Sequence, residues 1–131
     1  MKKLLFLFLI FFIVIVFAFL NKYSVNKNKS ILYTLNNKTY TLLTAKSPGE
    51  WEKGLMNYRK LDGVDGMIFL FPDKEIRSFW NKNTLMDLKL YWLNDDIVVG
   101  EDYLPSIEKS NKIVIITSPD KANKVIELVY Q

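Results

Sequence analysis

The chain has 131 residues with 18 basic and 14 acidic side chains, and it contains neither His nor Cys. These two absences exclude a His-based triad or proton shuttle, thiolate nucleophiles, disulfides and zinc sites built from Cys or His. The length suits one globular domain. The sequence therefore indicates the cellular location, the fold class and a candidate ligand-binding surface, but it specifies no reaction.

An uninterrupted apolar run extends from Leu4 to Leu20, directly after two lysines. In a helix it reaches ~25 Å, near the lower limit for crossing a hydrocarbon core of ~30 Å. Ala18 is the one small residue in the run, so the small-x-small pattern of a cleavage site is missing. We therefore expect residues 1–20 to be an uncleaved transmembrane anchor, with a cleaved signal peptide as the alternative.

The remainder of the chain is expected outside the cytoplasm, because a short basic N-terminus before an apolar run is typical of export signals. Residues 21–30 are polar and rich in Asn and Lys, which predicts a linker to a folded domain over residues 31–131. Leaving out Lys2 and Lys3 with the apolar segment, 16 basic side chains face 14 acidic ones. No run of four Lys or Arg occurs, so nucleic acid is not an expected partner.

The first predicted elements are a hairpin and a short helix. Strand-like runs at 31–35 and 39–44 flank Asn36-Asn37, a dipeptide that tolerates the positive φ of a hairpin turn. The residues from Ser47 to Glu50 then read as an N-cap, a Pro at the first helical position and a capping box. The helix that follows carries Trp51, Leu55 and Tyr58 at helical spacing.

The rest of the chain is predicted to be strands separated by Asn, Asp or Ser-Pro turns. We expect Pro72-Asp73 to close the first of these strands, and we expect large aromatic residues to fill the core, with Trp80 lining a cleft. Seven or eight short strands with one helix indicate a mainly β fold, a sandwich or distorted barrel of mostly antiparallel strands, rather than βαβ units. The further strands are expected at 67–71, 77–81, 88–93, 97–101, 112–117 and 124–130.

Two segments carry a family resemblance, GLMNYRKLDGVDGMIFLFP at 54–72 and SFWNKNTLMDLKLYW at 78–92. They resemble the domain of unknown function 192 family in a Gly-Leu-Met helix end, a Gly-Met-hydrophobic-Phe strand and a Phe-Trp-x-Lys-Asn-Thr motif. The resemblance covers about residues 40–131. It implies a compact β-rich fold, often behind a signal or anchor segment, with no established activity. Two positions depart from the pattern: Arg59 stands one step later than the family's arginine, and Lys89 replaces a frequent Asp.

The segment from Trp80 to Thr84 is the candidate ligand-binding surface. Asn and Thr are poor strand formers, so packing alone does not explain them, and together with Lys82 they offer hydrogen-bond donors to a small anionic or peptide-like ligand. The alternative is a turn in which these side chains satisfy their own backbone. We expect the segment to border the main pocket, with an arginine within reach. The candidate ligand-binding residues are Arg59, Arg77, Trp80, Asn81, Lys82, Asn83, Thr84 and Asp87.

The function that these features indicate is a membrane-anchored extracytoplasmic binding or accessory module. An enzyme acting on an envelope glycan or peptide through Asp87 or Lys82 is the alternative, and a purely structural envelope module is a third hypothesis. Other paired carboxylates fall in predicted turns, where Asp serves backbone geometry. We expect neither a metal ion nor a cofactor.

Overall fold

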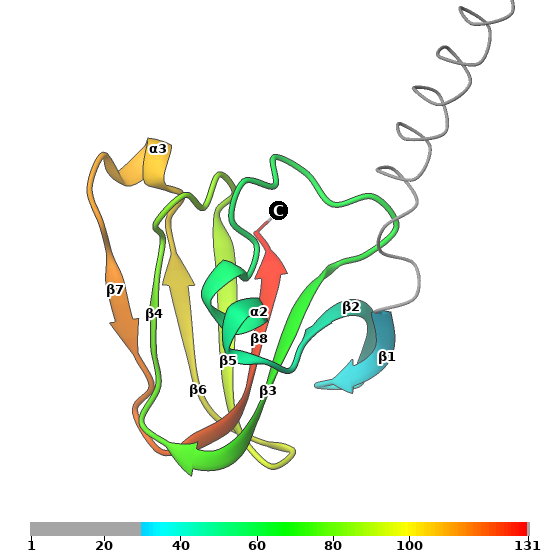
Figure 1. Cartoon of the computed structure of the whole chain (residues 1–131). Helices are drawn as coiled ribbons and strands as arrows, with labels where there is room; N and C mark the ends of the chain where they lie inside the picture. Colours follow the sequence, from blue (N-terminus) through cyan, green and yellow to red (C-terminus); the bar gives the residue numbers. More distant parts are fainter. Residues whose placement is uncertain (1–29, 131) are drawn as a thin grey trace, which may run out of the picture.

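The computed structural model describes residues 30–130, so the predicted anchor and nearly all of the linker lie outside the described residues (Figure 1). Within residues 30–130, no helix has both the length and the hydropathy of a membrane span. The elements are β1 (Ser30–Leu35), β2 (Lys38–Ala45), α2 (Pro48–Lys53), β3 (Gly66–Glu75), β4 (Ser78–Trp80), β5 (Leu88–Asn94), β6 (Ile97–Leu104), α3 (Ile107–Ser110), β7 (Ile115–Thr117) and β8 (Ala122–Val129).

The strands form a six-stranded sheet in the order β1-β2-β3-β8-β5-β6 and a separate two-stranded ribbon of β4 and β7. The predicted mainly β fold is confirmed, but the sheet has free edges at β1 and β6 and is no closed barrel. All strand pairs are antiparallel except β2 with β3, which are parallel and joined through α2. The expectation of no βαβ unit was therefore wrong, because the capped helix gives the chain room to return in the same direction.

The predicted hairpin and the predicted helix are both present. Asn36 and Asn37 have φ of 49° and 63°, as a two-residue hairpin turn requires. The Glu50 carboxylate accepts the backbone N–H of Ser47 at 3.2 Å, and this bond caps the helix. The Trp51 indole N–H then donates to the Ala45 carbonyl at 3.1 Å and fastens α2 to the end of β2.

Two local expectations need correction. Pro72 does not close β3, since the strand continues to Glu75. Its register with β8 shifts between Leu70 and Glu75, so Pro72 lies in an irregular stretch where its missing N–H costs no ladder bond. The short helix α3 was not predicted. It begins where the Ser106 hydroxyl accepts the Lys109 N–H, and four residues are too few to show helical periodicity.

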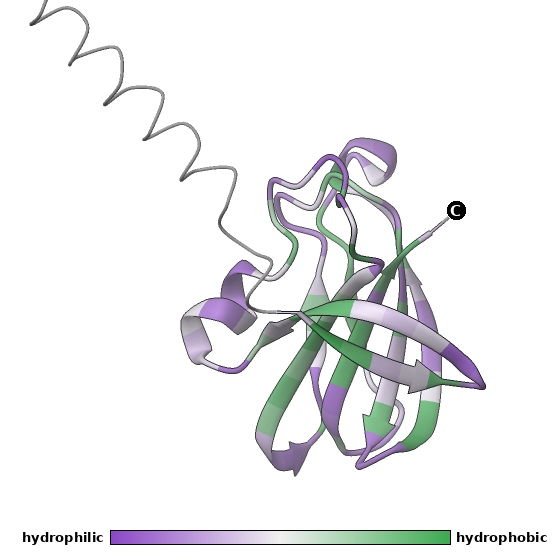
Figure 2. Cartoon of the chain, turned by 90° about the vertical axis from the view of Figure 1, so that its right-hand side faces the viewer, coloured by the Kyte–Doolittle hydropathy of each residue, from purple (hydrophilic) through white to green (hydrophobic). Residues whose placement is uncertain are grey.

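The main sheet is covered on both faces. On one face, the Phe79 ring of β4 packs edge-on against Phe69 and Trp92, with centroids 4.8 Å and 5.5 Å away. On the other face, the β1–β2 hairpin curls across the sheet (Figure 2). The Tyr33 hydroxyl of β1 donates to Asp96, in the β5–β6 turn, at 3.0 Å. The hairpin therefore leans towards β5 and β6 without pairing with them, and a pocket lined partly by Lys38 and Tyr40 of β2 lies beside it.

Candidate functional site

A pocket of about 540 Å³ lies where β8 ends, between the start of β2, the loop before β3, and β5. Of the candidate ligand-binding residues, only Arg59 lines it. The lining residues are Lys38, Tyr40, Arg59, Lys60, Leu61, Val64, Asp65, Met86, Lys89, Tyr91, Leu128, Val129 and Tyr130. The walls thus combine four cations, three tyrosines and one carboxylate around an apolar floor.

Two of the pocket cations are held by aromatic rings. The Lys89 ammonium lies 4.8 Å from the centre of the Tyr91 ring, and the Lys38 ammonium lies 5.0 Å from that of Tyr40. Lys89 also pairs with Glu101 at 2.8 Å, and this hydrogen bond raises the pKa of Lys89. Lys89, which departs from the family's usual Asp, therefore keeps its charge in the pocket at physiological pH.

The remaining charged groups of the pocket differ in how freely they can meet a ligand. The Asp65 carboxylate accepts the backbone N–H of Thr41 at 2.8 Å, so it serves to join the loop to β2. Arg59 is 73% exposed and contacts Glu108 at 3.2 Å. Such an exposed ion pair contributes little to stability and is readily exchanged for a ligand anion. The pocket lining therefore carries more positive than negative charge, although Arg59, Lys60 and Lys89 pair with carboxylates that are not part of the lining.

Asn81 is a structural residue. Its side chain is fully buried, and its amide N–H groups donate to the Pro105 carbonyl at 3.0 Å and to the Ser110 hydroxyl at 2.8 Å. Its side-chain oxygen accepts the backbone N–H of Val114 at 2.8 Å. These bonds join β4 to the segment around α3, and they leave the amide no free group for a ligand.

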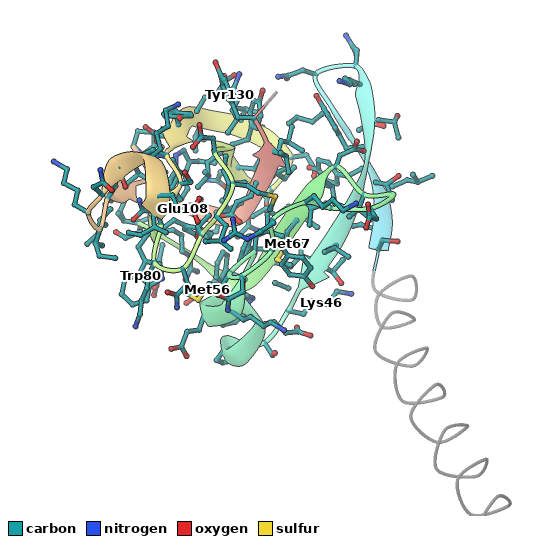
Figure 3. The ribbon with its side chains drawn as sticks, turned by 90° about the horizontal axis from the view of Figure 1, so that it is seen from above. Lys46, Met56, Met67, Trp80, Glu108 and Tyr130 are labelled. Carbon is teal, nitrogen blue, oxygen red and sulfur yellow. The ribbon has the colours of Figure 1, made fainter. Side chains whose placement is uncertain are left out.

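The other members of the 80–84 segment also lie outside the pocket. Thr84 is buried, and its backbone joins Asn81 to Ile107. Asn83 is exposed with φ of 54°, as in the turn that the alternative interpretation predicted. Lys82 lies with its ammonium 5.0 Å from the Trp80 ring. Figure 3 places Trp80 well away from Tyr130 of the pocket, so the expectation that this segment borders the pocket was wrong.

Arg77 is likewise occupied by the protein itself. Its Nε donates to the Ala122 carbonyl at 3.2 Å, Nη2 donates to the Asp73 carbonyl at 2.8 Å and also contacts the Asp73 carboxylate, and the guanidinium lies 4.0 Å from the Phe71 ring centre. The side chain is 15% exposed. It fastens the bulged end of β3 to β8.

Asp87 is held by three donors. Its carboxylate accepts the Lys109 ammonium at 2.8 Å, the Tyr103 hydroxyl at 2.7 Å and the Ser106 N–H at 2.8 Å. Burial raises the pKa of Asp87, but the hydrogen bonds from Lys109, Ser106 and Tyr103 outweigh it and hold the pKa well below its usual range. A carboxylate so stabilised is a weak base, so Asp87 is poorly suited to take a proton from a substrate.

Glu127 is a buried carboxyl that sequence reasoning missed. It lies in β8 opposite Met67 on one side and Leu90 on the other, on the core face of the sheet, and it is 4% exposed. Burial raises the pKa of Glu127 to about 8. Strand alternation over the predicted 124–130 run, which puts Glu127 on the same face as Val125 and Val129, was the available signal. Within residues 30–130, no group of three acidic side chains is arranged to hold a metal ion.

The comparisons agree with the resemblance read from the motifs. The model of the DUF192 family, described as an uncharacterized ACR, matches residues 31–130. The chain belongs to this family. Among solved structures, a provisionally named transcription regulator from Sinorhizobium meliloti is 28% identical, with a TM-score of 0.60 over 75% of this chain and 76% of that one.

A second solved structure with a similar fold is a protein of unknown function from Novosphingobium aromaticivorans. It is 22% identical, with a TM-score of 0.62 over 76% of this chain and 71% of that one, and this likeness shows the fold alone. The curated proteins gave no match.

Proposed function

We propose that this DUF192 chain is a membrane-anchored, extracytoplasmic binding module whose pocket at the end of β8 takes a small anionic ligand. The observation that carries the proposal is the pocket's lining, in which Lys38 and Lys89 stand beside the rings of Tyr40 and Tyr91. Ammonium groups bind carboxylate or phosphate oxygens, and tyrosine rings supply flat, apolar contact with a hydroxyl for hydrogen bonding. Pockets that combine an apolar floor with a few polar groups are typical of ligand sites.

The floor of the pocket favours a ligand that carries an apolar body as well as its charge. Leu128 and Val129 come from the end of β8, and Leu61 and Val64 come from the loop before β3. A bare inorganic anion satisfies the lysines but leaves these side chains without contact. An organic anion, such as an acidic sugar or a short acidic peptide, satisfies both.

The binding test uses the full chain in a non-ionic detergent. Citrate, glucuronate and inorganic phosphate are the probes, and binding is measured by thermal shift and by titration calorimetry. We expect glucuronate or citrate to raise the melting temperature more than phosphate, since a ligand that binds only the folded state stabilises it. The double variant K38Q/K89Q should bind at least about tenfold more weakly, the equivalent of ~1.4 kcal/mol.

The matched control removes the same charge elsewhere. Lys46 and Lys121 are exposed and do not line the pocket, so K46Q/K121Q should bind as the wild type does. Equal weakening by both double variants would mean that only the net charge matters. That result, or the absence of a shift with all three probes, would overturn the pocket assignment.

The anchor is tested separately. The uninterrupted apolar run Leu4–Leu20 motivates the proposal that the mature protein keeps its N-terminus. The protein should sediment with membranes after a carbonate wash, and protease added outside intact cells should remove the domain. Recovery of a soluble protein that begins near Asn21 would contradict the anchor and support the cleaved signal.

A further inference from the structure

The β4–β7 ribbon has one face on the core and one face turned outward. Phe79 and Ile116 pack against the core. Because side chains alternate along a strand, the residues next to them point the other way, and the paired Trp80 and Ile115 are 41% and 63% exposed. Ile113, just before β7, is 48% exposed. We call Trp80, Ile113 and Ile115, with the nearby Lys82 and Lys112, the ribbon's outer face.

The ribbon lies at the side of the molecule, and among the described residues no element covers its outer face (Figure 1). Soluble monomers seldom gather large apolar side chains on one exposed face, and such a patch usually marks an interaction surface. Trp is especially suited to a boundary between apolar and wet surroundings, because its ring is apolar and its indole N–H is polar.

The charged side chains of the ribbon's own two stretches all have one sign. Neither residues 78–84 nor residues 110–117 contain Asp or Glu, whereas each stretch contains one lysine. The Lys82 ammonium lies 5.0 Å from the Trp80 ring, and Lys112 is exposed next to Ile113. Lysine stems cover apolar surface while the ammonium reaches anionic groups. The outer face is thus apolar at its centre and cationic beside it.

We propose that the ribbon's outer face rests on an anionic membrane surface, with Trp80, Ile113 and Ile115 in the headgroup region and Lys82 and Lys112 against lipid phosphates. The combination matches the aromatic, aliphatic and cationic residues that interfacial segments use. This inference rests on the anchoring part of the proposed function. Residues 21–29 reach at most ~30 Å, so an anchored domain stays close to the bilayer. Because β1 and the ribbon lie on opposite sides of the molecule (Figure 1), the domain has to tip over on this linker for the ribbon's outer face to meet the lipid.

Tryptophan fluorescence tests the contact in the full chain. The protein has three tryptophans, Trp51, Trp80 and Trp92, and none lies in residues 1–29. Trp92 is fully buried, so Trp80 is the one best placed to reach lipid. The chain is reconstituted into vesicles of phosphatidylcholine, with or without phosphatidylglycerol, that contain brominated lipid as the quencher. We expect about a third of the emission to be quenched in the anionic vesicles, and the quenching to disappear in W80F.

Variants of the neighbouring side chains test whether the ribbon's outer face contacts the lipid or only lies near it. I115S should reduce quenching, whereas I97S, which removes an isoleucine that is 71% exposed in another strand, should not. K82Q/K112Q should abolish the difference between anionic and neutral vesicles. Sedimentation of each variant with carbonate-washed vesicles shows whether the anchor is in place. Failure of the anchor is thereby distinguished from failure of the ribbon to contact lipid.

Three outcomes would overturn the proposal. The first is an emission that brominated lipid does not quench in either vesicle while the chain is anchored. The second is equal quenching in W80F and the wild type. The third is a Trp80 that becomes shielded in detergent only as protein concentration rises, which would assign the face to a second copy of the chain.

Discussion

The side-chain oxygen of Asn81 accepts the backbone N–H of Val114 at 2.8 Å, and this bond joins the end of β4 to the segment that leads into β7. The same side chain donates to the Pro105 carbonyl and to the Ser110 hydroxyl from a fully buried position. The residue that the sequence offered as a ligand contact is therefore the main polar connection beneath the ribbon.

Replacing Asn81 by Ala should lower the free energy of unfolding by about 3 kcal/mol, because buried backbone and hydroxyl groups lose their partners. Urea unfolding of the full chain in non-ionic detergent measures the change. A loss below about 1 kcal/mol would contradict the structural role of the amide.

At Asn83, unlike Asn81, we expect the backbone conformation rather than the side chain to decide the effect of a substitution. Its φ of 54° lies in the left-handed region, where Ala is strained and Gly is not. Asn83→Ala should therefore cost about 1 kcal/mol, while Asn83→Gly should leave stability nearly unchanged. Thermal unfolding compares the two. Equal losses in both variants would show that the Asn83 side chain itself makes a stabilising contact.

Gly66 should not tolerate a side chain. A Cβ at this position would lie 1.9 Å from the Glu127 carbonyl oxygen of the neighbouring strand. Gly66→Ala should separate β3 from β8 and cost about 3 kcal/mol or more, as overpacking against a rigid backbone does. Gly49 in α2 is the matched control, because nothing lies within 4 Å of a Cβ there. Gly49→Ala should leave the melting temperature unchanged or slightly higher.

Glu127 should make stability fall as pH rises. Burial raises the pKa of its carboxyl to about 8 in the folded protein, against an ordinary value of 4.5. Between these values the folded state holds a proton that the unfolded state has lost, so the free energy of unfolding falls by up to ~1.4 kcal/mol per pH unit. Glu127→Gln removes this dependence and should be the more stable protein at pH 8. Parallel pH profiles of wild type and variant would contradict the burial of an ionisable group.

Asp87 should have the opposite effect to Glu127, so that stability falls as the pH is lowered. The hydrogen bonds from Lys109, Ser106 and Tyr103 hold the pKa of Asp87 below its ordinary value of 3.8. The carboxylate therefore contributes its full amount to the free energy of unfolding above pH 3.8. This contribution is lost as the pH falls below 3.8 and Asp87 becomes protonated. Asp87→Asn should cost about 2 kcal/mol at pH 7, and the difference from wild type should narrow below pH ~4. Urea titrations at pH 7 and pH 3 measure it, with Asp62→Asn, an exposed carboxylate, as the control.

Local sequence signals were sufficient to predict the first hairpin and the helix α2. The Asn36-Asn37 turn and the cap at Ser47 depend on neighbouring residues only, so reading them in sequence predicted them correctly. Phe79 packs against the core, as expected of a large aromatic residue, whereas Trp80, expected to line a cleft, is exposed and does not line the pocket. The parallel pairing of β2 with β3 was missed because it depends on where the returning strand finds an edge, which no local pattern specifies.

The sequence by itself determined a mainly β domain of the DUF192 family, since strand alternation, turn residues and the family motifs are properties of short segments. Only the tertiary structure decided what the polar residues do. It turned Asn81 and Arg77 inward to backbone groups that folding brings to them from distant segments. It also brought together two Lys-x-Tyr pairs, Lys38 with Tyr40 of β2 and Lys89 with Tyr91 of β5, since local sequence does not specify which strands border the same pocket.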